Sequence, residues 1–250
     1  MPPSSSPDFW DTKPGALRRL GEQSRWWDMT YRDWLSILGA PSTLWDIGCG
    51  FGQFVRVALE TGWEAFGVEE SKYACERTVA PRECIHNAPW DNLIAGLINP
   101  RAISALWLME HLDDASAFLD WASRMLGEGG MLLAVVPNEH TGLQAAANRV
   151  AAKKDWWVHP SHKHYWEGDS FYGLLSSHGF IVVDELRTWP MEAFILAGID
   201  YTDNPDIGKA AHKRVEDIEM AETREQRLRR GRQWAENGQG RDLVVFARKR

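Results

Sequence analysis

The sequence has few cysteines and no long apolar run, and both features limit the classes of protein to which the chain can belong. Cysteine occurs three times in 250 residues (Cys49, Cys75 and Cys84), an odd number without metal-ligand spacing, which predicts free thiols in a reducing compartment. The longest apolar stretches, 103–109 and 131–136, are far shorter than the ~20 residues of a membrane-spanning helix. The first ten residues, MPPSSSPDFW, have neither a basic start nor an apolar run, so we predict no signal peptide and a cytoplasmic location.

Positive charge is also scarce over most of the chain. Residues 209–250 hold twelve Lys and Arg against seven Asp and Glu, which leaves sixteen basic and twenty-eight acidic side chains for residues 1–208. Acidic proteins are in general poor binders of nucleic acid, so we expect no nucleic-acid partner. Tryptophan, in contrast, is abundant, with fourteen residues, of which seven are clustered in 10–34 and 156–166. Such clusters indicate either an aromatic core or a pocket built from flat rings.

The order of apolar segments predicts an α/β fold. Segments with strand composition alternate with amphipathic or capped segments, and this alternation is typical of a parallel, doubly wound sheet. We therefore expect a Rossmann-like, mostly parallel sheet of seven strands. The predicted strands are 43–49, 63–70, 81–87, 103–112, 131–138, 180–189 and 242–248, and the predicted helices between them are 52–62, 71–80, 113–130 and 169–180.

The remaining segments predict the domain organisation. Residues 1–8 are rich in Pro and Ser and are expected to be disordered, while 15–38 has helical spacing of apolar residues, so 1–40 is interpreted as a tail and a helical cap. Residues 41–250 are expected to form one α/β domain with insertions at about 138–168 and 190–240 that lie over the strand ends. The second insertion contains a charged helix at about 209–236.

The most specific motif is the glycine loop in LWDIGCGFGQF, residues 44–54. A buried strand leads into Gly48, Gly50 and Gly52, and a helix follows. Glycine permits positive φ and lets a ligand approach the backbone, and the helix N-terminus offers unpaired N–H groups. Asp46 lies just before the loop, and Glu69 stands nineteen residues after Gly50 at the end of the second predicted strand. An acid at that place can bind both hydroxyls of a ribose.

Two kinds of cofactor suit such a loop. A dinucleotide prefers G-x-G-x-x-G, but the third position after Gly50 is Gln53, which counts against a nucleotide-dependent oxidoreductase. The pattern D-x-G-x-G-x-G instead matches S-adenosylmethionine methyltransferases, whose cofactor carries an ammonium group that an acid near the loop would favour. A tight turn without a ligand is the structural alternative.

Four blocks of sequence carry a resemblance to a known family. They are LWDIGCGFGQF, GVEES, LWLMEHLDD with LGEGGMLLAVVPN, and HPSHKHYWEGDSFYGLLSSHGF. The chain resembles the class I S-adenosylmethionine-dependent methyltransferases, in the methyltransferase domain 23 branch, near the ubiquinone-biosynthesis O-methyltransferases. The resemblance runs from about Trp45 to Gly179 and resumes at Asp242, and the tail is similar to relatives associated with glycan biosynthesis. Residues 1–40 carry none of it.

The resemblance implies S-adenosylmethionine as cofactor and S-adenosylhomocysteine as product. It places the methionine half of the cofactor at the glycine loop, the ribose hydroxyls at Glu69, and the adenine just past the third strand. The residues implied in cofactor binding are Trp45, Asp46, Gly48, Cys49, Gly50, Gln53, Phe54, Glu69, Glu70, Ser71, Asn87, Ala88, Trp90, Leu108 and Met109.

Methyl transfer from a sulfonium is an in-line displacement, so the enzyme mainly aligns the reactants and excludes water. A hydroxyl acceptor also needs a base, and histidine suits that role near neutral pH. We predict His164 or His162 as the base, with His111 as the next candidate. The predicted acceptor is a small molecule or a sugar. Methylation at nitrogen or carbon, a structural role for each histidine, and a homodimer all stay open.

Three further features have a functional and a structural interpretation. His159, His162 and His164 with Glu110 and His111 could ligate a metal, but their spacing is not a recognised signature, so no metal is predicted. Residues 228–234, LRRGRQW, either contact a phosphate or form a solvated helix face paired with nearby acids. Trp156, Trp157 and Trp166 either stack on a sugar ring or pack the insertion on the sheet.

Overall fold

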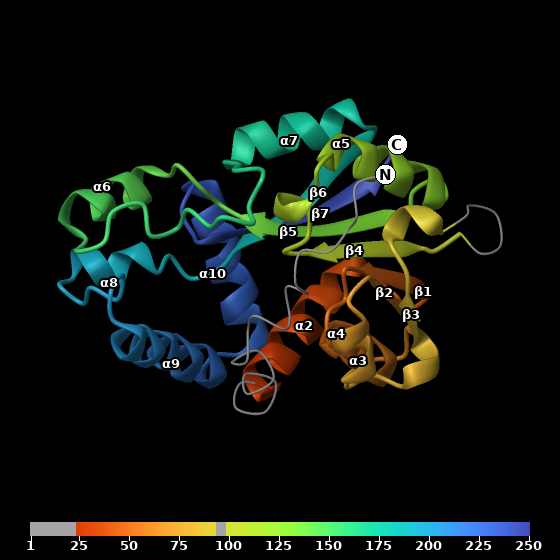
Figure 1. Cartoon of the computed structure of the whole chain (residues 1–250), viewed down its shortest axis with the longest axis horizontal. Coiled ribbons are helices and arrows are strands. Elements are labelled where there is room, and N and C mark those ends of the chain that lie inside the picture. The colour runs from red at the N-terminus through yellow and green to blue at the C-terminus, as the bar shows by residue number, and fades with distance from the viewer. Residues whose placement is uncertain (1–23, 94–98) are drawn as a thin grey trace.

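The computed structural model describes residues 24–93 and 99–250 and contains one seven-stranded sheet (Figure 1). The strand order is β3-β2-β1-β4-β5-β7-β6, with β7 antiparallel to both of its neighbours and the other pairs parallel. The predicted Rossmann-like fold is therefore confirmed. The strands are β1 (Thr43–Ile47), β2 (Glu64–Glu69), β3 (Ile85–Asn87), β4 (Ala102–Leu106), β5 (Met131–Pro137), β6 (Phe180–Arg187) and β7 (Asp242–Lys249).

Helices cover both faces of this sheet, and each face has its own apolar core (Figure 1). On one face lie α5 (Ala115–Met125) and α7 (Gly168–Ser177), which bury Phe118 and Phe171 completely. On the other lie α2 (Ser24–Leu38) and α3 (Gln53–Glu60), which bury Trp34 and Phe54 against the sheet. Because β4 and β5 are buried between these two layers, their sequences are almost continuously apolar.

Short elements connect the strands on the side of β2 and β3. The helix α4 (Lys72–Glu76) begins at Ser71, whose hydroxyl accepts a hydrogen bond from the Ala74 amide at 3.0 Å. One-turn 3₁₀ helices occupy η1 (Arg82–Cys84) and η2 (Trp90–Asn92), so the predicted helix 71–80 and strand 81–87 are both shorter than expected. Regular helix thus ends at Glu76, and η1 occupies the first part of the predicted third strand.

Two segments leave the sheet beyond the ends of β5 and β6. They contain α6 (Gly142–Val150) and then α8 (Glu192–Leu196), α9 (Pro205–Ala221) and α10 (Arg224–Glu236) (Figure 1). The single charged helix predicted over 209–236 is wrong, because Thr223 starts a new helix. Its hydroxyl and the Gln226 side chain form a reciprocal capping box with the backbone.

The fourth strand is also shorter than predicted. It ends at Leu106 instead of running to residue 112, because Trp107 takes a left-handed conformation with φ of 50°. The chain then forms the 3₁₀ helix η3 (Met109–His111). A positive φ is strained for a bulky side chain, and such strain is concentrated at functional sites.

Some expectations fall outside the described residues. The structure does not describe residues 1–23. The expectations that lie there concern the tail 1–8, Trp10 and the part of the predicted helix 15–38 that precedes Ser24. Across 24–93 and 99–250, none of the helices combines the length and the apolar character that crossing a membrane requires.

Candidate functional site: a glycine loop beside an aromatic cavity

The glycine loop leaves the sheet at the carboxyl end of β1. Gly48, Gly50 and Gly52 have φ of 69°, 54° and 71°, a region in which other residues are strained. A Cβ on Gly48 would lie 2.8 Å from Cδ1 of Leu108, so the residue following Trp107 packs directly against the loop. The loop is anchored to β2, because the amides of Gly48 and Cys49 both donate to the Val68 carbonyl.

Glu69 ends β2 and holds this loop in place. Its Oε2 accepts a hydrogen bond from the Gly50 amide at 2.8 Å, and its Oε1 accepts one from the Ser71 amide at 2.8 Å. The carboxylate is buried, with the residue 9% exposed. Each carboxylate oxygen can accept more than one hydrogen bond. The sequence-based placement of Glu69 beside the loop is thus reproduced.

Asp46 lies in β1, two residues before Gly48, and is opposite Ser104 of β4. It is buried, with 2% of the residue exposed. The Ser104 hydroxyl donates to its Oδ1 at 2.7 Å. The pKa of Asp46 is raised to about 7, mainly by burial; the hydrogen bond from Ser104 opposes this rise and the negative Glu69 contributes to it. An approaching cation would favour the ionised form of this carboxyl group.

The residues that the resemblance implies in binding the ribose and the adenine cluster around the end of β2. The Asn87 side chain donates to the carbonyls of Glu69 and Glu70 at 2.9 and 2.8 Å, and the Ala88 amide donates to Glu69 at 3.1 Å. Ser71 contributes its amide, as described above. These five polar positions, predicted from separate stretches of sequence, are therefore brought to one place.

Other predicted cofactor residues have side chains that turn away from the loop. Phe54 and Met109 are in the apolar core, and Trp45 packs against it. The Gln53 amide donates to Asp28 of α2 at 3.2 Å. Trp90 is only partly buried, with its ring edge-on to Phe118 and Trp121.

Two of the three candidate base residues lie together. The rings of His111 and His162 meet edge to face with centroids 4.9 Å apart. The Ser161 carbonyl lies 3.0 Å from His111 Nδ1 and can only accept, so that nitrogen carries the proton and Nε2 carries the lone pair. His164 lies elsewhere: its Nε2 is 3.0 Å from the Leu112 carbonyl and its ring stacks on Trp166. The His164 ring is thus held in place by the backbone carbonyl and by the stacked indole.

Glu110 is a buried carboxyl group next to this histidine pair. It is 1% exposed, and burial raises its pKa to about 8, with Asp242 and Glu139 adding to the shift. Its Oε2 is buried without a hydrogen-bond partner. In the described part of the chain, Glu110, His111 and His162 place one ligand atom each within 4.8 Å of the others. The sequence analysis expected no metal, and that stays a prediction.

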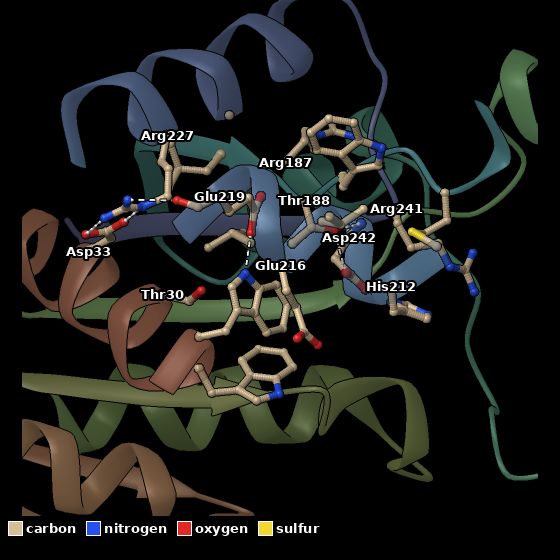
Figure 2. A pocket seen from close by; sticks show the side chains of 18 of the residues that line it. Thr30, Asp33, Arg187, Thr188, His212, Glu216, Glu219, Arg227, Arg241 and Asp242 are labelled. Carbon is tan, nitrogen blue, oxygen red and sulfur yellow. Dashed lines mark hydrogen bonds and ion pairs between the residues drawn. The ribbon is translucent and has the colours of Figure 1, made fainter. Parts of the chain in front are cut away.

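Trp107 also lines a cavity of about 930 Å³. Figure 2 shows this cavity. Its walls come from α2, α9, α10 and the adjoining ends of β6 and β7. The sequence analysis missed this cavity and its residues Trp107, Glu216 and Asp242. No local pattern predicts it, because Trp107 donates to Asp242 from 135 residues away.

Two arginines of the segment 228–234 have acidic partners. Arg230 pairs with Glu219 and Glu222 at 2.9 and 2.6 Å, and Arg232 pairs with Asp184 at 2.6 Å. The predicted pairing of this segment with nearby acids is therefore present.

Comparison with known families fits this geometry. The family described as a methyltransferase domain, the methyltransferase domain 23 family, matches residues 25–185, more than half of the chain. The chain belongs to this methyltransferase family. Its match begins within α2, earlier than the resemblance that we placed from about Trp45. The expectation that residues 1–40 lie outside the resemblance is thus wrong for the described helix α2.

Solved structures of methyltransferases share the fold across nearly the whole chain. A SAM-dependent methyltransferase from Archaeoglobus fulgidus is 15% identical with a TM-score of 0.60, covering 97% of this chain and 100% of its own. A methyltransferase from Haloferax volcanii, solved with the Trm112 methyltransferase activator, is 17% identical with a TM-score of 0.62, covering 98% and 99%. One from Mesorhizobium loti is 17% identical with a TM-score of 0.55, covering 88% and 98%. No curated protein matches this chain.

Proposed function

We propose that this methyltransferase moves a methyl group from S-adenosylmethionine to a hydroxyl of a small molecule or glycan. The observation that carries the cofactor assignment is the position of the Glu69 carboxylate. It lies at the end of β2 and accepts a hydrogen bond from the Gly50 amide. Glu69 holds the ribose hydroxyls, and Gly48 and Gly50 let the methionine half approach the backbone. Support also comes from the solved neighbours, which are SAM-dependent methyltransferases by name.

The ammonium group of the cofactor lies near Asp46 in this proposal. Cofactor and acceptor meet at the carboxyl ends of the strands, where α/β sheets bind ligands. The sulfonium supplies the methyl group when bound, and the chain supplies alignment and the exclusion of water. Leu108 contacts the loop and Trp107 lines the cavity, so these two neighbours mark the boundary between donor and acceptor.

The proton of the acceptor hydroxyl goes to a histidine. Of the three predicted residues, His111 and His162 have the favourable geometry, because they share one site beside η3, which directly follows Leu108. His164 is assigned a positioning role, since its Nε2 is used by the Leu112 carbonyl. Glu110 contacts neither ring at hydrogen-bond distance, with 4.0 Å between its Oε1 and His111 Nε2.

The proposed function is tested by incubating the full chain with S-adenosylmethionine carrying a labelled methyl group and a panel of pyranosides and phenols. We expect a labelled ether and S-adenosylhomocysteine in equal amounts. The position of the label, read by NMR, distinguishes transfer to oxygen from transfer to nitrogen or carbon. If S-adenosylhomocysteine does not bind in calorimetry, the cofactor assignment itself is wrong.

Binding of S-adenosylhomocysteine is expected to depend on pH through Asp46. The carboxyl group has a raised pKa of about 7, and the ligand's ammonium group favours its ionised form. Below pH 7 the group must release a proton on binding, so the affinity should fall by up to about tenfold per pH unit, and it should level off above pH 7. Calorimetry between pH 5.5 and 8, in buffers of different ionisation enthalpy, measures both effects. Asp46→Asn should remove the dependence, and an equally steep profile in that variant would contradict the assignment.

A further inference from the structure

The cavity beside Trp107 is joined directly to the cofactor loop. Trp107 has the strained φ of 50° and donates from Nε1 to Asp242 at 3.0 Å, which fixes the indole at the cavity wall. The next residue, Leu108, packs on Gly48. Consecutive residues therefore form part of the cavity wall and the contact with the loop where the methionine half of the cofactor is proposed to bind.

Indole rings form a large part of the cavity wall. Trp27 of α2 meets Trp107 edge to face with centroids 5.3 Å apart, and Trp26 and Trp189 also line the cavity. All four rings are only partly buried, so they present apolar surface. Flat rings of this kind bind the apolar face of a ring-shaped ligand.

The cations that line the cavity are already neutralised. The side chains of Arg227 and Arg230 are only 12% and 17% exposed, and a phosphate would have to displace the carboxylates paired with them. Six Lys and Arg side chains line the wall, and each has an acidic partner: Arg187 with Glu185, Lys209 with Asp206, Lys213 with Asp217, Arg227 with Asp33, Arg230 with Glu219 and Arg241 with Glu139.

The carboxylates of the wall also have hydrogen-bond or ion-pair partners. Asp33 accepts from Arg227, Glu219 accepts from Trp26 and Arg230, and Asp242 accepts from Trp107 and the Thr188 hydroxyl. Glu216 has Lys213 at 3.9 Å, and Figure 2 shows its carboxylate extending toward the indole rings. The cavity thus offers hydrogen-bonding oxygens and apolar rings, and each of its lining Lys and Arg side chains has an acidic partner.

We infer that this cavity is the acceptor site and that it takes an uncharged, hydroxyl-bearing ring of the saccharide type. This inference rests on the proposed function, because it names the acceptor of the same reaction. The ring lies with its apolar face on Trp27 and its edge toward Trp107, whose ring stands at 85° to that of Trp27, and its hydroxyls donate to Glu216. A phosphate would have to displace the acidic partners of the lining cations, and an ammonium group would have to displace donors already bound to the wall carboxylates, so each charged sugar is bound more weakly than the neutral ring.

The inference is tested by ligand-observed NMR on the full chain saturated with S-adenosylhomocysteine. The probes are neutral methyl pyranosides of glucose, galactose, mannose, rhamnose and xylose, with glucose 6-phosphate, glucosamine and phenol as comparisons. We expect saturation transfer from the protein to at least one neutral pyranoside. Among the glucose probes we expect the neutral glycoside to bind at least as tightly as its charged counterparts.

Two variants place the binding in this cavity. Trp27→Ala should weaken binding of the neutral pyranoside about tenfold or more, because truncated aromatic anchors typically cost that much. Glu216→Gln preserves the side-chain shape and should weaken it several-fold. The matched control is Trp156→Ala, since Trp156 lies in the insertion against Trp157 and Tyr201 and was the sequence-based alternative for sugar stacking. Trp27→Phe keeps a ring in the wall if the alanine variant does not fold.

The outcomes separate this inference from the proposed function. If S-adenosylhomocysteine binds but no neutral pyranoside does, or if a charged probe or phenol binds more tightly, the inference is overturned and the function stands. Pyranoside binding that survives Trp27→Ala and Glu216→Gln, or that is lost in Trp156→Ala, also overturns it. If S-adenosylhomocysteine does not bind to the wild-type chain, the proposed function fails first.

Discussion

We expect Glu69→Ala to weaken the binding of S-adenosylhomocysteine by at least about a hundredfold. Two ribose hydroxyls would lose a charged acceptor, and hydrogen bonds to charged groups contribute about 1.5–3 kcal/mol each. The same substitution removes the acceptor of the Gly50 and Ser71 amides, so the glycine loop itself loses its anchor. Calorimetric titration of wild type and variant measures the change in dissociation constant.

Matched variants separate the contact with ribose from the anchoring of the loop. Glu69→Gln retains an oxygen for one amide and should bind more tightly than Glu69→Ala but less tightly than wild type. Glu64→Ala removes the exposed acid at the opposite end of β2 and should bind normally. An affinity of Glu69→Ala within threefold of wild type, in a variant whose circular dichroism is unchanged, would refute the ribose assignment.

The second large effect is expected for the histidine pair. His162→Ala and His111→Ala should each lower kcat by about a hundredfold or more, the usual contribution of a general base. The affinity for S-adenosylhomocysteine should stay within about twofold, because neither ring is assigned to the cofactor. His164→Ala should have a smaller effect on kcat, since its Nε2 is held by a backbone carbonyl. Steady-state kinetics with an acceptor from the panel measures all three.

Two measurements show whether the pair acts as a base. The acid limb of the kcat profile should be lost in the variant that removes the base and kept in His178→Ala, a histidine paired with Asp120 on the outer helices. Treatment of the wild-type enzyme with a chelator should leave kcat unchanged, because no metal is predicted. Loss of activity on chelation, restored by a divalent ion, would instead assign Glu110, His111 and His162 as metal ligands.

The cofactor side was largely predictable from sequence because its signals are local. Gly48, Gly50 and Gly52 adopt the positive φ that their pattern predicts, and Glu69 reaches the loop because parallel neighbours β1 and β2 end at the same edge. Side-chain direction was less predictable. Phe54 lies one position into α3, and whether it faces the ligand or the core depends on the helix packed against it, here Tyr31 of α2.

The acceptor side was not predictable from sequence, since it depends on contacts between distant elements. The wall joins Trp27 of α2, Trp107 after β4 and Glu216 of α9, and nothing in the local sequence pairs them. The early end of β4 was also hidden, because a left-handed Trp107 has neither the glycine nor the proline that usually ends a strand. The boundary between α9 and α10 was readable, since Thr223 and Gln226 form the T-x-x-Q spacing of a capping box.

The antiparallel strand β7 has a consequence for how the protein is made. It enters the sheet between β5 and β6, although every other described helix and strand precedes it in the chain. During translation, β5 and β6 therefore have open edges until residues 242–249 emerge from the ribosome, and open strand edges invite misassociation with other chains. Asp242 and its bond to Trp107 arrive with that strand, so the nascent enzyme gains its acceptor wall only at the final folding step.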